Sequence, residues 1–294
     1  MNIDISDKKI IDFSKIFSSS IFKELSETGE SKKLSQILLE VGLLQNIDLK
    51  QNLATFFDES YKILSKKYKN EYVYKNTIIK KILLGRHSLN TAFLINECRV
   101  GSSKADSVIF NGTSTVYEIK SEYDSFSRLE QQLNDYKKAF EYINIVVPSS
   151  SVDKLKDYLK DDYIGIIRLN KNNTLSIIRE AKSNKKYFDK SVIFDILNQN
   201  EYKAIVKKYF DNVPDVPNTK VYAEYKKYFE QLSIEIIHNE IVKNLKQRGN
   251  NKSLKEFIEN IPDSLKVLAL QTKLTNKAKE NLLNLLKKDI KNIV

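Results

Sequence analysis

The spacing of hydrophobic positions along the chain changes from helical to strand-like near residue 90 and returns to helical after residue 186. In the first seventy residues apolar side chains recur every three or four positions, as in KLSQILLEVGLLQ and LATFFDESYKILSKKY. This is the spacing of amphipathic helices. The same period continues through NEYVYKNTIIKKILLG, where Gly85 stands at a suitable position for a C-terminal cap. The pattern therefore predicts a helical N-terminal layer and a further helix before the first strand.

Six short runs in the middle of the chain are rich in Val, Ile, Tyr and Phe, and most are bounded by Gly, Asn, Ser or Pro. They are AFLINECRV, KADSVIFN, STVYEIKS, YINIVVPS, YIGIIRLN and TLSIIREA. Such runs are typical of strands. FSRLEQQLNDYKKAFE separates the third run from the fourth, SVDKLKDYLK separates the fourth from the fifth, and both have helical spacing. We expect six strands with two helices between them.

This order predicts an α/β fold in which a mixed sheet is flanked by helices. Three consecutive segments follow from it: a helical N-terminal layer over residues 1–70, a core over residues 71–186 and a mainly helical C-terminal region over residues 187–294. NVPDVPNTK interrupts the last region, and its Pro214 and Pro217 predict a linker or hinge.

Composition limits the classes of protein that remain. The chain of 294 residues is 41% hydrophobic and 30% charged, which excludes the disordered class. The single cysteine, Cys98, excludes an internal disulfide and a cysteine-rich zinc site and fits a reducing compartment. The N-terminal residues do not resemble a signal peptide, and no apolar run is long enough to cross a membrane. We expect a cytoplasmic protein that does not enter a membrane.

The chain carries a net positive charge, and the excess of basic residues is unevenly distributed along it. The 49 Lys and Arg exceed the 38 Asp and Glu, giving a net charge of +11. Basic residues exceed acidic ones by 20 to 16 in residues 71–200 and by 18 to 12 in residues 201–294. Such an excess is typical of proteins that bind nucleic acid, because Lys and Arg displace counterions from phosphates. A solvated lysine-rich surface would give the same totals, so charge alone permits nucleic acid without requiring it.

The stretch SKADSVIFNGTSTVYEIKSE places charged residues in an otherwise apolar hairpin. Asn111 and Gly112 form the strongest turn signal in the chain. If a three-residue turn pairs Phe110 with Ser114, Asp106 lies opposite Glu118. Lys120 then shares their face, because residues two apart on a strand point the same way. A two-residue turn would put the two acids on opposite faces, so the register decides whether a site exists.

Two carboxylates on a largely buried sheet repel each other unless a cation or proton lies between them. Their hard oxygens favour Mg²⁺, which binds one or two carboxylates together with waters and phosphate oxygens. Mn²⁺ is expected to substitute. The Lys120 ammonium could then orient a water or stabilise charge on phosphorus. The alternative is an ion-pair cluster on an edge strand that points into solvent.

These residues resemble the active-site core of the PD-(D/E)XK nucleases. Asp106 matches the aspartate of that motif, Glu118 and Lys120 match its second half, and Ala105 stands where the motif has proline. A poorly characterised bacterial branch of the superfamily is similar over about residues 71–148, through EYVYKN, LLGRHS, RVGSSKAD, YEIKSE and QQLNDY. The resemblance implies a restriction-endonuclease-like fold and metal-dependent hydrolysis of phosphodiester bonds.

The same resemblance implies further site residues. Glu71 opens the helix that in many members carries a glutamate near the metal, although an acid at a helix start is also favoured by the helix dipole. Gln132 and Tyr136 match a Q-x-x-x-Y of the recombination-nuclease branch. Arg128 extends that stripe on one helical face, where the three residues would bind substrate or form a solvated polar stripe. Glu97 and Arg99, on the strand before Asp106, are weaker candidates.

Other site types lack their motifs. His87 and His238 have no partner at metal-ligand spacing, and the chain contains no glycine-rich phosphate loop and no GxSxG turn. We therefore expect a metal-dependent nuclease whose substrate is DNA, with the segment after Pro217 adding nucleic-acid contact or a homodimer surface. The alternative is a non-catalytic protein that binds DNA or another partner with a nuclease-like fold, in phage defence or repair.

Overall fold

The computed structural model describes residues 5–44, 48–213, 215–249 and 252–293. By contacts the chain forms two compact units. The first consists of Met1–Ile82, Lys171–Asn173 and Asn251–Val294, and the second consists of Leu83–Asn170 and Thr174–Asn250. All the strands lie in the second unit.

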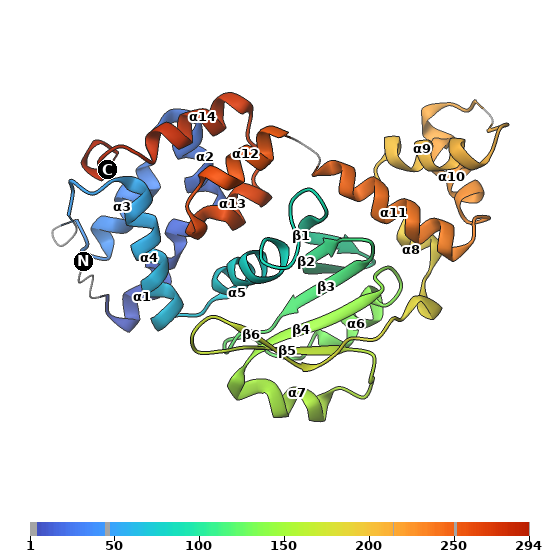
Figure 1. Ribbon diagram of the computed structural model, residues 1–294, viewed down its shortest axis with the longest axis horizontal. Helices are drawn as coiled ribbons and strands as arrows, with labels where there is room; N and C mark the ends of the chain where they lie inside the picture. Colours follow the sequence, from blue (N-terminus) through green and yellow to red (C-terminus); the bar gives the residue numbers. More distant parts are fainter. Residues whose placement is uncertain (1–4, 45–47, 214, 250–251, 294) are drawn as a thin grey trace. The chain divides into compact units, whose positions relative to one another are not determined.

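The second unit is built on a six-stranded mixed sheet in the order β1-β2-β3-β4-β5-β6 (Figure 1). Strands β3, β4 and β5 are parallel to one another, whereas the pairs β1–β2, β2–β3 and β5–β6 are antiparallel. The six predicted strands are confirmed, as is the mixed α/β fold with helices flanking the sheet. The strands are β1 (Phe93–Val100), β2 (Ser103–Phe110), β3 (Ser114–Ile119), β4 (Tyr142–Pro148), β5 (Gly165–Leu169) and β6 (Leu175–Arg179).

Two crossover helices follow from the parallel strands, because a parallel pair cannot be joined by a tight turn. Helix α6 (Leu129–Tyr136) connects β3 to β4, and α7 (Val152–Tyr158) connects β4 to β5. Leu129, Leu133 and Tyr136 of α6 recur at helical spacing and are buried in the same core as Val108 and Val116 of the hairpin. This packing directs one side of α6 at the face of the sheet that carries the candidate acids.

Four more helices follow the sheet in the second unit. Ile237, Ile241 and Leu245 of α11 join the core at intervals of four residues, and α11 packs on β1 and β2. The predicted helical segment after Pro217 is therefore present. The four helices are α8 (Lys190–Phe194), α9 (Gln199–Tyr209), α10 (Asn218–Phe229) and α11 (Ile234–Arg248).

The first unit is helical among its described residues, as the N-terminal pattern predicted. Its C-terminal residues return to the N-terminal helices, with α14 packed on α2, and α13 packed on α2 and α5. The helices are α1 (Asp7–Ser14), α2 (Ser19–Thr28), α3 (Lys32–Glu40), α4 (Leu53–Lys67), α5 (Glu71–Ile78), α12 (Lys252–Asn260), α13 (Lys266–Gln271) and α14 (Asn276–Leu285). No helix in the described part of the chain is long and apolar enough to cross a membrane.

Two local expectations turn out differently. Helix α5 continues as a π-helix over Ile79–Leu83, and Gly85 is not among the glycines with positive φ, so it does not form the expected left-handed cap. The predicted linker joins α9 to α10, but its Pro214 lies outside the described residues.

Candidate functional site

The β2–β3 hairpin has the register on which the candidate site depends. Phe110 pairs with Ser114, and Asn111, Gly112 and Thr113 form the turn. Gly112 has a φ of 67°, a left-handed value that glycine adopts without steric cost, which explains why this position can turn the chain. The expected three-residue turn is confirmed.

Asp106 lies where the β2–β3 ladder ends. The last paired residues on this side are Ser107 and Tyr117, and one further step brings Asp106 opposite Glu118. At this position the N–H of Ile119 donates to a side chain and not to a backbone carbonyl. Its acceptor is Oδ2 of Asp106, at 2.7 Å. The carboxylate is thereby held against the strand that carries Glu118 and precedes Lys120.

Glu118 and Lys120 are buried, with 1% and 8% of their surface exposed. Lys120 Nζ lies 3.1 Å from Glu118 Oε1. Strand β3 is an inner strand between β2 and β4. The alternative of a solvent-facing ion pair on an edge strand is therefore excluded for this pair. Because a buried charge is costly without partners, the surrounding side chains must compensate for the burial.

Gln132 and Tyr136 of α6 supply that compensation. Gln132 Nε2 donates a 2.6 Å hydrogen bond to Glu118 Oε1, and Gln132 Oε1 accepts a 2.8 Å bond from Lys120 Nζ. Tyr136 Oη donates to Glu118 Oε2 at 2.7 Å and lies 3.0 Å from the carbonyl oxygen of Lys104. These contacts tie α6 to β3, so the polar stripe of α6 faces the sheet at these two residues and not solvent.

The protonation of this cluster follows from its burial. Burial raises the pKa of the Glu118 carboxyl, while the nearby Lys120 and the hydrogen bonds from Tyr136 and Gln132 act in the opposite direction. Burial also raises the pKa of the Tyr136 phenol, and the negative charges of Glu118 and Asp106 raise it further. Tyr136 therefore stays protonated and acts as a hydrogen-bond donor. The negative charges of both candidate acids contribute to the raised pKa of its phenol.

A second buried carboxylate fixes the position of α6. Oδ2 of Asp135 accepts hydrogen bonds from Ser102 Oγ at 2.9 Å and Ser103 Oγ at 2.6 Å, both at the β1–β2 turn. A Cβ added at Gly101 would lie 2.7 Å from Asp135 Oδ1. The turn thus needs glycine to bring these donors close to α6, and the contact holds the helix that presents Gln132 and Tyr136.

The remaining predicted residues differ in their surroundings. Arg128 is exposed at the N-cap position of α6 and so remains available for contact. Glu71 belongs to the first unit, where it opens α5 and its carboxylate lies 2.6 Å from Lys75 Nζ. This contact fits the role of an acid at a helix start, and the predicted catalytic role of Glu71 stays a prediction.

Glu97 and Arg99 lie on β1, and both are exposed. The Glu97 side chain pairs with Lys104. Its backbone is in the left-handed region, with a φ of 56°, between the pairs Asn96–Ser107 and Cys98–Ala105 and thus opposite Asp106. A non-glycine residue costs about 1 kcal/mol or more in this conformation. Backbone strain is therefore located on β1, at the residue opposite Asp106 of the candidate site.

Asp106 and Glu118 are the residues that could hold the predicted Mg²⁺, and the metal site stays a prediction. No group of three or more His, Cys, Asp and Glu side chains that could hold a metal ion is found in residues 5–44, 48–213, 215–249 and 252–293. Mg²⁺ commonly takes one or two carboxylates and completes its shell with waters and substrate phosphates. The donor set therefore suits an ion that binds together with a phosphate.

Comparison with known proteins identifies the family. The family described as bacteriophage P4 protein cII matches residues 64–282, which is most of the chain and includes every candidate site residue. The chain belongs to the bacteriophage P4 protein cII family.

One relative and one solved structure are similar to this cII-family chain. Protein cII of Enterobacteria phage P4 is 27% identical over 211 residues, which cover 69% of this chain and 76% of that protein. The SPO1766 protein of unknown function from Silicibacter pomeroyi matches 47% of this chain and 75% of its own chain, with 13% identity and a TM-score of 0.28.

Sequence patterns missed one buried polar cluster in this cII-family chain. His238 is buried, and its Nε2 lies 3.3 Å from Ser114 Oγ and 3.4 Å from Glu141 Oε2. Thr113 and Ser183 also donate to the Glu141 carboxylate. His238 and Glu141 are 97 positions apart. No local spacing could reveal the pair, since only the packing of α11 on the sheet brings them together.

Proposed function

We propose that this protein is a metal-dependent nuclease that hydrolyses phosphodiester bonds, with DNA as its substrate. The observation that carries the proposal is the buried pair of Glu118 and Lys120 beside Asp106 at the end of the hairpin ladder. A buried ion pair is costly to maintain, and such groups gather at functional sites. The resemblance of the D-x11-E-x-K pattern to PD-(D/E)XK nucleases gives the same chemistry.

In this proposal each side chain has a separate role. Asp106 and Glu118 would hold Mg²⁺ or Mn²⁺, which when bound polarises a phosphoryl oxygen and lowers the pKa of a water. The Lys120 ammonium, held by Gln132, is positioned to stabilise the charge that develops as the water oxygen bonds to phosphorus. The water gives up a proton to solvent, the bond between phosphorus and the leaving oxygen breaks, and that oxygen takes a proton from solvent.

Gln132 and Tyr136 are better suited to positioning than to substrate contact. Their polar atoms are already engaged by Glu118 and Lys120. Arg128 is exposed and can reach phosphate. We propose that binding uses this arginine and the basic helices that follow the sheet, which could also form a homodimer surface. A cytoplasmic location fits the single cysteine.

A second function is favoured by one feature of the same cluster. Both oxygens of the Glu118 carboxylate already accept hydrogen bonds from the protein. A site that is satisfied in this way needs no metal to be stable, as expected for a non-catalytic protein that binds DNA or another partner in phage defence or repair. The two proposed functions differ in whether the protein cleaves its substrate.

The test is cleavage by the purified full chain in Mg²⁺ or Mn²⁺ of linear, nicked, branched and single-stranded DNA and of RNA. We expect cleavage of DNA, and its loss in Asp106→Ala, Glu118→Ala and Lys120→Ala alike, because the three act as one unit. In calorimetry the two acid variants should lose metal binding, whereas Lys120→Ala should retain metal and DNA binding. If the wild type cleaves none of these substrates, the binding function is favoured.

A further inference from the structure

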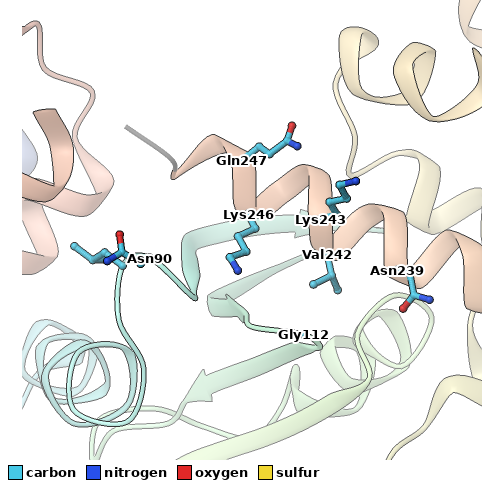
Figure 2. A pocket seen from close by; sticks show the side chains of 8 residues that line it. Asn90, Gly112, Asn239, Val242, Lys243, Lys246 and Gln247 are labelled. Atoms are coloured by element: carbon cyan, nitrogen blue, oxygen red, sulfur yellow. The ribbon is translucent and has the colours of Figure 1, made fainter. Parts of the chain in front are cut away.

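A cavity of about 400 Å³ lies in the second unit at the turn end of the β2–β3 hairpin, away from the acids (Figure 2). Gly112 and Asp106 are six residues apart, which corresponds to about 20 Å along an extended strand. One side of α11 forms one wall, and the segment around Asn90 together with the hairpin turn contributes the rest. Its main lining residues are Asn90, Gly112, Asn239, Val242, Lys243 and Lys246.

The lining has positive charge and no carboxylate. Lys243 and Lys246 are three residues apart on α11, and neither forms an ion pair with any residue in the described part of the chain. Glu240, the nearest acid on that helix, is buried and bonded to Lys208 and Tyr209. Lys243 lies close enough to Glu240 to lower the pKa of that carboxyl, whereas Lys246 extends to the cavity side of the helix. The positive charge of Lys246 favours an anion in the cavity.

The shape leaves room for more than the anion itself. The side chains of Lys246, Val242 and Asn239 extend from α11 toward the side of the hairpin turn, as Figure 2 shows. No atom lies within 4 Å of the position that a Cβ would take at Gly112, so the turn side is open. Cavities of this volume are in the range of small-ligand sites, and a phosphate alone would leave most of the space empty.

We propose that this cavity binds a nucleoside phosphate. Lys246 takes the phosphate. The carboxamide of Asn239 can donate to and accept from the edge of a base, as Asn and Gln side chains do when they bind adenine. Val242 gives an apolar surface beneath the sugar or base. The same chemistry is offered by a free nucleotide and by one nucleotide of a nucleic-acid strand.

This site does not depend on the proposed hydrolysis, and its test uses binding in metal-free buffer. Titrations of the full chain are made with adenosine monophosphate, inorganic phosphate and a short oligothymidylate. We expect the mononucleotide to bind once per chain, and Lys246→Gln to weaken it about tenfold by removing a charge-assisted contact. Asn239→Ala should weaken the nucleotide but not phosphate. Lys32→Gln, at an exposed lysine of α3, is the matched control and should bind as the wild type does.

The outcomes distinguish the source of the ligand. If Lys246→Gln loses the mononucleotide but binds the oligonucleotide normally, the site takes a free nucleotide. If it loses both, the site takes a nucleotide of a strand. The proposal is overturned if the wild type binds neither the mononucleotide nor the oligonucleotide, or if Lys246→Gln and Lys32→Gln bind both equally well. Thermal unfolding of each variant checks that the fold is intact, and a failed cleavage assay would leave all these results unaffected.

Discussion

Gln132 on α6 donates a 2.6 Å hydrogen bond to Oε1 of Glu118 on β3. The same amide accepts from Lys120, so its orientation is fixed, because an ammonium can only donate and a carboxylate can only accept. The crossover helix thus does more than connect two parallel strands. It carries the group that holds the acid and the lysine of the candidate site in one arrangement.

Replacing Gln132 should disturb both Glu118 and Lys120, because its side-chain amide contacts each of them. We expect Gln132→Leu to destabilise the protein by about 1–3 kcal/mol, because it leaves a buried carboxylate with one donor fewer. DNA cleavage should fall at least about tenfold if Lys120 is positioned through Gln132. Asn134→Ala, on the exposed side of α6, is the matched control. Chemical denaturation and cleavage rates measure the two effects, and unchanged values for both would contradict the positioning role.

The raised pKa of the Glu118 carboxyl predicts a stability difference that depends on pH. The folded state binds this proton more tightly than the unfolded state, so stability is lost as pH rises through the raised pKa. Glu118→Gln lacks this loss. The substitution also removes the charged partner of the buried Lys120, so the expected signal is the pH dependence and not the absolute stability. Relative to the wild type, Glu118→Gln should gain stability as pH rises from about 4 to 7. Denaturant titrations across this range measure the change, and a difference that is constant with pH would count against it.

His238 predicts the opposite pH dependence. Burial lowers the pKa of its imidazole, Lys185 lowers it further, and Glu141 raises it. The unfolded state therefore takes up the proton first, so the wild type should lose stability as pH falls through the ordinary value near 6.5 toward the lower folded value. His238→Gln should lose less stability than the wild type over this pH interval. Lys185→Gln should also lose less, because it removes a cation that opposes protonation. Denaturation curves at neutral and mildly acidic pH decide the matter, and parallel curves for all three proteins would refute it.

The contact of Asp135 with the β1–β2 turn predicts coupling between fold and site. Asp135→Asn should cost about 2 kcal/mol, because hydrogen bonds from Ser102 and Ser103 to a charged acceptor become bonds to a neutral one. Ser127→Ala, at an exposed position near the start of α6, serves as a control. Thermal unfolding gives the stability. If Asp135→Asn unfolds like the wild type, this contact does not hold α6.

Arg128 predicts a change in salt dependence. If the exposed guanidinium contacts a phosphate, Arg128→Ala should weaken DNA binding and lower the slope of log affinity against log salt by about one phosphate contact. Lys32→Ala, at an exposed position of α3, should leave the slope unchanged. Binding titrations at several salt concentrations provide the slopes, and equal slopes for the wild type and Arg128→Ala would assign this arginine to the solvated surface.

Local patterns in the sequence determined much of the second unit. Short runs rich in Val, Ile, Tyr and Phe predicted the six strands, and Asn111 with Gly112 predicted the position of the turn between β2 and β3. These features are set by neighbouring residues, since a strand's faces follow from its period of two and the turn follows from the conformations that glycine allows. The length of the turn, and with it the position of Asp106 opposite Glu118, was left open by the sequence and is decided by the structure.

Only the tertiary structure decided which side of α6 meets the sheet. The stripe of Arg128, Gln132 and Tyr136 has helical spacing, but spacing alone does not show whether it faces solvent or the protein. The burial of Leu129 and Leu133 beside Val108 turned Gln132 and Tyr136 toward Glu118 and left Arg128 exposed. This choice depends on contacts across the whole core, which no single segment encodes.

The same reason applies to contacts between residues far apart in the chain. Residues 252–293 return to the N-terminal helices, and α11 brings His238 to Glu141 and Lys246 to the hairpin turn. The sequence shows that these helices are amphipathic, because periodicity is a local property. Which apolar stripe covers which surface is settled by the burial of many side chains at once, and it is known only when the chain has folded.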